Sequence, residues 1–215
     1  QAPDLYRSNV NGVRYNVFNS TLFADTNGHL SRYDKAQLVP FVERFPFVEF
    51  LNKVDIFKWV DWGEHAGFGL GNKTSMIKSP SGFISPGLVC YDSVFPSWNQ
   101  AFVREGAQIL TIITNDGWWG NSSGHIQHFA YARLRAIEFR RWVVRSANNG
   151  LSGIISPDGS VNQKTKYWTR TSFSADVPLR NDLSFYTRWG DWLSILCFFL
   201  VFLSVGYGWV TRKRS

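Results

Sequence analysis

Short apolar runs alternate with amphipathic segments through the middle of this chain, and that alternation constrains its fold more than any other feature. Apolar runs occupy 82–90 and 108–114, and each is followed by a helical pattern, over 95–105 and from about 125 to 141. A short apolar run bounded by turn residues predicts a buried strand, whereas apolar residues spaced three and four apart predict a helix. Strand–helix–strand order predicts layers of helix and sheet, so we expect an α/β fold.

The longest helical pattern follows Ser122, Ser123 and Gly124, which are suited to cap its first turn. His125 and His128 stand three residues apart at its start. A metal site needs three or four ligands, so we interpret both histidines as residues of the helix surface or a groove rather than as zinc ligands. We expect one apolar stripe of this helix to face the core, formed by Ile126, Phe129, Ala130, Leu134 and Ile137.

Further strands are predicted on both sides of this central part. Residues 15–24 alternate enough for a strand, a turn with Gly28 follows, and a hairpin partner is expected within 30–38. After the long helix, 142–146 and 153–156 have the character of two more strands. The expected domain therefore has strands near both of its ends.

Residues 47–60 carry apolar side chains at helical spacing, with charged residues between them. This pattern predicts an amphipathic helix. Packing against the protein core and lying at a membrane surface are both open for it.

The C-terminal segment 192–210 contains nineteen residues without a charge, with tryptophan near both ends. As a helix it is long enough to cross a hydrocarbon core of roughly 30 Å, so we predict a transmembrane helix, with a buried core helix as the alternative. The basic tail 211–215 then stays in the cytoplasm, and the preceding domain lies on the other side of the membrane. The net charge of +7 fits an anionic membrane surface. It would also fit nucleic acid, but no recognised nucleic-acid module is present, so we expect no nucleic-acid partner.

Cys90 ends the apolar run 82–90 and precedes a polar turn. The only other cysteine, Cys197, lies in the apolar C-terminal segment, so a disulfide between the two is implausible. A thiol at the end of a strand can be presented as an exposed nucleophile, but free cysteine is also a common buried apolar residue. Position alone leaves both interpretations open.

A cysteine nucleophile reacts as the thiolate and needs a nearby cation, a base and donors for the oxyanion. Lys35 precedes the apolar residues 38–41, which indicates that its side chain enters the core beside a strand, and Glu43 could orient its ammonium group. The turn of Tyr91 and Asp92 is a further candidate element. No phosphate loop or dinucleotide fingerprint is present, so we expect no nucleotide cofactor, and we expect no metal.

Several motifs occur in an order that gives the chain a resemblance to a known family. They occupy 33–43, 89–92, 114–120, 127–138, 145–150 and 157–159. From about Tyr15 to its end, the chain resembles bacterial apolipoprotein N-acyltransferases, a membrane-bound branch of the nitrilase (carbon–nitrogen hydrolase) superfamily.

The resemblance implies a nitrilase-like α-β-β-α sandwich over residues 1–188, followed by the transmembrane helix at 192–210 and the cytoplasmic tail at 211–215. The sandwich is expected to be incomplete at its N-terminus, so that the chain is the C-terminal portion of a longer protein. The resemblance further implies a monomer in the bacterial inner membrane, with the catalytic domain facing the periplasm.

The resemblance also implies a Glu-Lys-Cys triad, in which Cys90 is the nucleophile and Lys35 stabilises the thiolate and the tetrahedral oxyanion. Glu43 and Asp92 match supporting carboxylates, although the family usually has Glu where Asp92 stands. The backbone N–H of Tyr91 suits an oxyanion hole. The family's general base lies upstream in a Trp-Pro-Glu segment, and no Glu precedes Lys35 here, so we predict that the 215 residues alone are inactive.

The implied reaction has two halves. Cys90 attacks a phospholipid ester to give a thioester and a lysophospholipid, and the α-amine of a diacylglyceryl-cysteine at the N-terminus of an apolipoprotein then takes the acyl chain. Phospholipid, apolipoprotein and membrane are therefore the expected partners. Two alternatives stay open: a membrane-anchored nitrilase-type amidase that hydrolyses a small amide, and an inactive fragment that lacks its general base.

Overall fold

The computed structural model describes residues 7–10, 13–47, 67–71, 74–80 and 82–212. Nearly all of the helix predicted at 47–60 lies outside the described residues. The C-terminal part of the domain is built on one six-stranded sheet, in the order β10-β9-β8-β7-β6-β5. Its strands are β5 Met76–Lys78, β6 Ile84–Val89, β7 Leu110–Thr114, β8 Val143–Ala147, β9 Gly153–Ile155 and β10 Val161–Lys164.

The three central strands of this sheet are parallel. β6 pairs with β7 so that Val89 lies opposite Ile113, and β7 pairs with β8 so that Thr114 lies opposite Ala147. Parallel neighbours require crossover connections, which here are the helices α2 (Pro96–Arg104) and α3 (Ser123–Phe139). The carboxyl ends of β6, β7 and β8 therefore meet at one edge of the sheet, and this edge carries the site described below. The predicted α/β architecture is confirmed in this part of the chain.

Local signals set the ends of the two crossover helices. Pro96 stands in the first turn of α2, where a missing N–H costs nothing. The hydroxyl of Ser122 accepts a hydrogen bond from the backbone N–H of Gly124 and so caps α3, as its position predicts. At the other end of α3, Arg140 takes a left-handed conformation with φ of 51° and terminates the helix.

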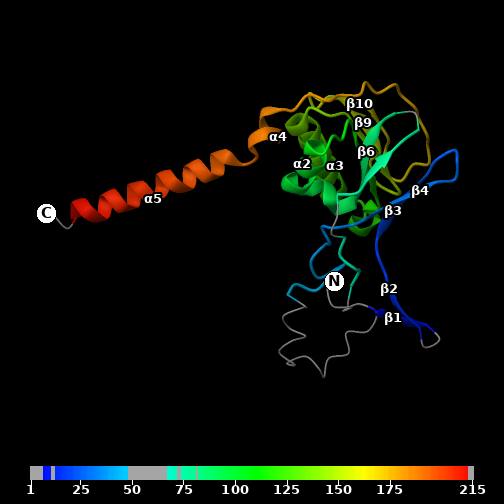
Figure 1. Ribbon diagram of the computed structural model, residues 1–215, viewed down its shortest axis with the longest axis horizontal. Coiled ribbons are helices and arrows are strands. Elements are labelled where there is room, and N and C mark those ends of the chain that lie inside the picture. The colour runs from blue at the N-terminus through cyan, green and yellow to red at the C-terminus, as the bar shows by residue number, and fades with distance from the viewer. Residues whose placement is uncertain (1–6, 11–12, 48–66, 72–73, 81, 213–215) are drawn as a thin grey trace.

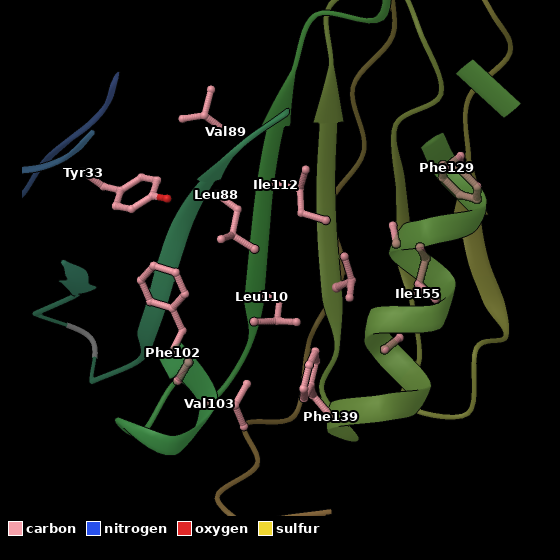
Figure 2. Packing of buried hydrophobic residues seen from close by; sticks show 14 of the residues in the cluster. Tyr33, Leu88, Val89, Phe102, Val103, Leu110, Ile112, Phe129, Phe139 and Ile155 are labelled. Atoms are coloured by element: carbon pink, nitrogen blue, oxygen red, sulfur yellow. The ribbon is translucent and has the colours of Figure 1, made fainter. Parts of the chain in front are cut away.

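The core forms where α2 and α3 pack on one face of the sheet (Figure 1). Leu88, Leu110 and Ile112 project from three neighbouring positions of β6 and β7 toward aromatic side chains of the two helices (Figure 2). Burying each such side chain contributes about 1.5–3 kcal/mol relative to exposure. The fully buried aromatic residues of the helices are Phe102 and Phe139.

The predicted apolar stripe of α3 is wrong, apart from Phe129. Ile126, Leu134 and Ile137 are about half exposed, and Ala130 is exposed as well. The buried face is instead made of positions with the same three-and-four spacing in a different phase. It consists of His125, His128, Phe129, Ala132, Arg135, Ala136 and Phe139. The two histidines, interpreted from the sequence as surface or groove residues, are thus nearly completely buried. The ring nitrogens of His128 have polar partners that the sequence pattern does not show, and the ring of His125 stacks on Tyr167.

The N-terminal strands form two separate hairpins. The strand predicted at 15–24 is interrupted, and its parts belong to β2 (Val13–Asn16), which pairs with β1 (Arg7–Val10), and to β3 (Ser20–Ala24). β3 pairs with β4 (Leu30–Asp34) as the expected hairpin, and the turn between them contains Gly28 at a φ of 80°.

The β3–β4 hairpin contacts the central sheet where the side chain of Thr21 approaches the backbone of Gly87 closely. The hydroxyl of Thr21 donates to the carbonyl oxygen of Gly87 over 2.9 Å. A Cβ atom at Gly87 would lie 2.7 Å from the Thr21 methyl group, so glycine is required at this crossing. This contact places the end of β4 beside the end of β6.

The C-terminal segment is helical, as predicted. α4 (Phe185–Trp189) leads into α5 (Trp192–Arg212), which extends away from the rest of the protein (Figure 1). Within the described part of the chain, however, no helix meets the combined length and hydropathy needed to cross a membrane. The predicted transmembrane helix at 192–210 is therefore not confirmed.

Truncating a core aromatic residue tests the packing of the helices on the sheet. We expect Phe102→Ala to lower the free energy of unfolding by about 3–5 kcal/mol, because Phe102 is fully buried and its loss leaves a cavity. The matched control Phe173→Ala removes the same atoms from a side chain that is 39% exposed and should cost under about 1 kcal/mol. Urea unfolding measures both, and equal losses would contradict this core.

Candidate active site

Cys90 follows directly on the last residue of β6 and opens a short 3₁₀ helix, η2 (Cys90–Val94). Its φ is 49°, a left-handed conformation that residues other than glycine rarely adopt. Such strain is of order 1–3 kcal/mol and persists only where neighbouring contacts hold the backbone. The thiol is half-buried, and both Cys90 and Cys197 are free. The structure thus presents the Cys90 thiol on a strained turn at the end of a strand.

Asp92 joins this turn to the segment that carries Lys35. The carboxylate is fully buried and accepts four hydrogen bonds. One oxygen accepts from the backbone N–H groups of Ala36 at 3.2 Å and Gln37 at 2.7 Å, immediately after Lys35. The other oxygen accepts from the backbone N–H of Val89 at 3.1 Å and, at 2.9 Å, from the hydroxyl of Tyr33. Asp92 therefore fixes the end of β4 against the end of β6.

The surroundings of Asp92 shift the pKa values of two groups. Burial raises the pKa of Asp92, and the donated hydrogen bonds and the positive charge of Lys35 oppose this rise. Burial and the nearby Asp92 charge raise the pKa of Tyr33, so its hydroxyl keeps its proton and remains a donor. The indole N–H of Trp98 donates to the same hydroxyl over 2.9 Å. Trp98, Tyr33 and Asp92 thus form one chain of hydrogen bonds.

Lys35 is completely buried and paired with Glu43. Its Nζ lies 2.8 and 2.6 Å from the two carboxylate oxygens of Glu43. The carboxylate also accepts from the backbone N–H of Val39 at 2.8 Å and from the Asn19 side chain at 3.2 Å. The entry of Lys35 into the protein beside a strand and its contact with Glu43 are both as the sequence predicts. A buried charge held in this way has a fixed position, which a cationic group at a reacting centre requires.

Tyr91 is the first residue after Cys90 in η2, and its ring packs edge-to-face on Phe95 at 5.3 Å between centroids. The structure therefore brings Cys90, Tyr91 and Asp92 together in one turn and ties Lys35 to it through Asp92. A second carboxylate, that of Glu43, is connected to these residues through its ion pair with Lys35.

A second buried polar network lies at the same edge of the sheet and was missed by the sequence interpretation. It consists of Asp116, which follows β7, His128 on α3 and Arg145 on β8. Arg145 Nη2 donates to Asp116 over 2.7 Å, and His128 Nδ1 lies 2.9 Å from the other carboxylate oxygen. On its far side, His128 Nε2 lies 3.2 Å from the carbonyl oxygen of Cys90.

The charges of this network are set by burial and by one another. Burial alone would raise the pKa of Asp116, but the hydrogen bond with His128 and the charge of Arg145 bring it below its ordinary value. Burial lowers the pKa of His128, and Asp116 opposes this change. Burial likewise lowers the pKa of Arg145, against the attraction of Asp116.

Two sequence signals could have pointed to Asp116 and Arg145. Asp116 and Arg145 belong to motifs at the ends of two neighbouring parallel strands, where open α/β sheets gather functional groups. Gly150 is a further sign, because a Cβ atom there would collide with the carboxylate of Asp116. The motif 145–150 thus supplies both a partner for Asp116 and the space that Asp116 occupies.

The carbon–nitrogen hydrolase family model matches residues 6–181, and the chain therefore belongs to this family. Two solved structures share the fold: Nit3 of Saccharomyces cerevisiae, a member of branch 10 of the nitrilase superfamily, and an amidase from Nesterenkonia. The first has a TM-score of 0.53 at 18% identity, covering 71% of this chain and 51% of Nit3. The second has a TM-score of 0.51 at 21% identity, covering 69% of this chain and 51% of the amidase. The nitrilase-like α/β fold is confirmed.

Within this family the chain is similar to curated apolipoprotein N-acyltransferases. It is 35% identical over 201 residues to the protein of Chlorobaculum tepidum, and the match covers 87% of this chain. It is 34% identical over 187 residues to the protein of Geobacter metallireducens, covering 86% of this chain. The predicted resemblance is confirmed. The chain spans only 36% and 35% of the length of these two relatives.

Replacing one oxygen of Asp92 tests the bridge between the two strand ends. In Asp92→Asn an amide NH₂ takes the place of an acceptor and faces backbone N–H donors, so we expect a loss of about 1–3 kcal/mol in the free energy of unfolding. Asp176→Asn makes the same change at an exposed loop position and should leave stability unchanged. Urea unfolding of both variants decides; an unaltered midpoint for Asp92→Asn would show that the carboxylate does not bridge the strands.

Proposed function

We propose that this chain supplies the nucleophile and its stabilising groups for an apolipoprotein N-acyltransferase. The observation that carries the proposal is the buried Lys35, paired with Glu43 and tied through Asp92 to the strained turn of Cys90. The similarity to relatives that bear this name supports the choice of reaction.

In the first half-reaction, the Cys90 thiolate attacks the sn-1 ester carbonyl carbon of a phospholipid. A carbon–sulfur bond forms, the ester carbon–oxygen bond breaks, and the lysophospholipid leaves after its oxygen takes, through the general base, the proton that the Cys90 thiol gave up. The ammonium of Lys35 would stabilise the thiolate and then the tetrahedral oxyanion, to which the backbone N–H of Tyr91 would donate. Glu43 would orient Lys35, and Asp92 would hold both strand ends in place.

In the second half-reaction, the α-amine of a diacylglyceryl-cysteine attacks the thioester carbonyl. The amide bond forms, the carbon–sulfur bond breaks, and the proton lost by the amine restores the Cys90 thiol. An amine attacks a thioester more readily than an oxygen ester, which explains the use of a cysteine. The product is the N-acylated N-terminus of an apolipoprotein.

The proposal includes a general base outside this sequence. The family resemblance implies a glutamate upstream of the lysine motif, and no glutamate precedes Lys35 in these 215 residues. We therefore infer that the chain alone does not complete the transfer. The relatives are bacterial proteins of which this chain spans only 36% and 35%, and we propose the same setting for this one: the inner membrane, with the catalytic groups on the periplasmic side.

The test is the acyl-enzyme. When the full-length protein is incubated with phospholipid that carries a labelled sn-1 chain, we expect one acyl group on Cys90, seen by peptide mass spectrometry and released by a diacylglyceryl-cysteine peptide. Cys90→Ala should abolish the label, and the matched change Cys197→Ala should retain it, because Cys197 lies in α5 away from the site.

Two outcomes would contradict the proposal. Absence of label on Cys90 would exclude the transfer reaction. Hydrolysis of a small amide with release of ammonia, in place of acyl transfer to the peptide amine, would identify an amidase that uses the same groups.

A further inference from the structure

His128 makes contacts that the proposed reaction does not yet use. It is 2% exposed, and both of its ring nitrogens have polar neighbours. Nδ1 lies 2.9 Å from Asp116 Oδ1 and 3.0 Å from Arg145 Nη2. Nε2 lies 3.2 Å from the carbonyl oxygen of Cys90 and 3.4 Å from the hydroxyl of Ser93. The ring therefore connects a buried ion pair to the backbone of the nucleophile.

The protonation of the ring decides what it can do to that carbonyl group. With a proton on Nε2, the ring donates to the carbonyl oxygen of Cys90 and accepts at Nδ1 from Arg145. A second proton on Nδ1 adds a donor toward Asp116 and leaves the first hydrogen bond intact. In both forms an N–H faces Cys90, whereas a single proton on Nδ1 would leave an unprotonated Nε2 against the carbonyl oxygen, so the donation to Cys90 requires the proton on Nε2. Ser93 donates a second hydrogen bond to the same oxygen over 2.8 Å.

Holding this oxygen also fixes a donor on the other side of the peptide bond. The carbonyl group of Cys90 and the N–H of Tyr91 belong to one planar peptide unit and point in opposite directions. A rotation of that unit would turn the Tyr91 N–H away from its present direction. The strained φ of 49° at Cys90 makes an external restraint necessary.

We propose that His128, oriented by Asp116 and Arg145, is a positioning residue that clamps the Cys90–Tyr91 peptide and thereby aims the Tyr91 N–H at the developing oxyanion. The inference rests on the proposed function for the meaning of that N–H. The clamp itself rests only on the contacts of His128 and on the conformation of Cys90. A direct role of His128 as a base for the thiol is not needed, since its Nε2 faces the carbonyl oxygen.

Substituting His128 with Gln or with Asn tests the contacts of Nε2 and Nδ1 separately. In His128→Gln the side-chain amide nitrogen reaches about as far as Nε2 and can donate to Cys90, whereas in His128→Asn the amide reaches only as far as Nδ1. In the full-length protein, we expect His128→Asn to lower the rate of acyl-enzyme formation about 10- to 100-fold at unchanged KM, and His128→Gln to recover most of it. Alkylation of Cys90 by iodoacetamide should change less than about threefold in both, because the clamp acts on the oxyanion donor rather than on the thiolate.

A readout independent of acyl transfer uses the Tyr91 amide. With ¹⁵N-tyrosine labelling, relaxation of this amide should show a mobile peptide in His128→Asn and a rigid one in wild type and His128→Gln. Identical relaxation in all three proteins would overturn the clamp, as would a parallel loss of acylation and alkylation in both variants. If wild type forms no acyl-enzyme while the relaxation pattern is as expected, the proposed function fails and the clamp stands.

Discussion

The buried carboxylate of Asp92 is the interaction on which the site depends. It accepts hydrogen bonds from two backbone N–H groups after Lys35, from one before Cys90 and from the hydroxyl of Tyr33. Hydrogen bonds to a charged group contribute about 1.5–3 kcal/mol each, so four of them can offset the cost of burying the charge. The segments at the ends of β4 and β6, two strands of separate sheets, are thereby hydrogen-bonded to one carboxylate group. Together with the Thr21–Gly87 contact, this bridge keeps a lysine fifty-five residues before a cysteine at a defined place.

The site has two supporting networks with different tasks. The network of Asp92 sets the position of Lys35 relative to the Cys90 turn, and the pairing with Glu43 fixes the lysine itself. The network of Asp116, His128 and Arg145 reaches the same turn from the side of β7, β8 and α3, and it holds the Cys90 carbonyl group. Both networks lie at the carboxyl ends of strands, because the parallel arrangement of β6, β7 and β8 brings three such ends to one edge.

Much of this fold follows from local sequence signals, and the failures have a common physical cause. Strand and helix limits around Cys90 were predictable because turn residues and apolar runs are short-range features. The face of α3 was not, since His128 and Arg135 are polar and periodicity assigns polar residues to solvent. Hydrogen-bond partners such as Asp116 offset the desolvation cost of burying these side chains. Such partners are distant in the sequence, so a local pattern does not reveal them. Lys35 was predictable because Leu38 and its apolar neighbours already indicate burial beside it.

The most direct measurement of the bridge is amide hydrogen exchange of Gln37 and Val89 in the intact protein. Both N–H groups donate to Asp92, although Val89 ends β6 and Gln37 follows β4, which belongs to another sheet. The structure predicts that both amides are protected and open with the same free energy, because release of the carboxylate frees them together. Fast exchange of Gln37 beside a protected Val89 would contradict the account, since the segment of Lys35 would then move independently of the Cys90 turn.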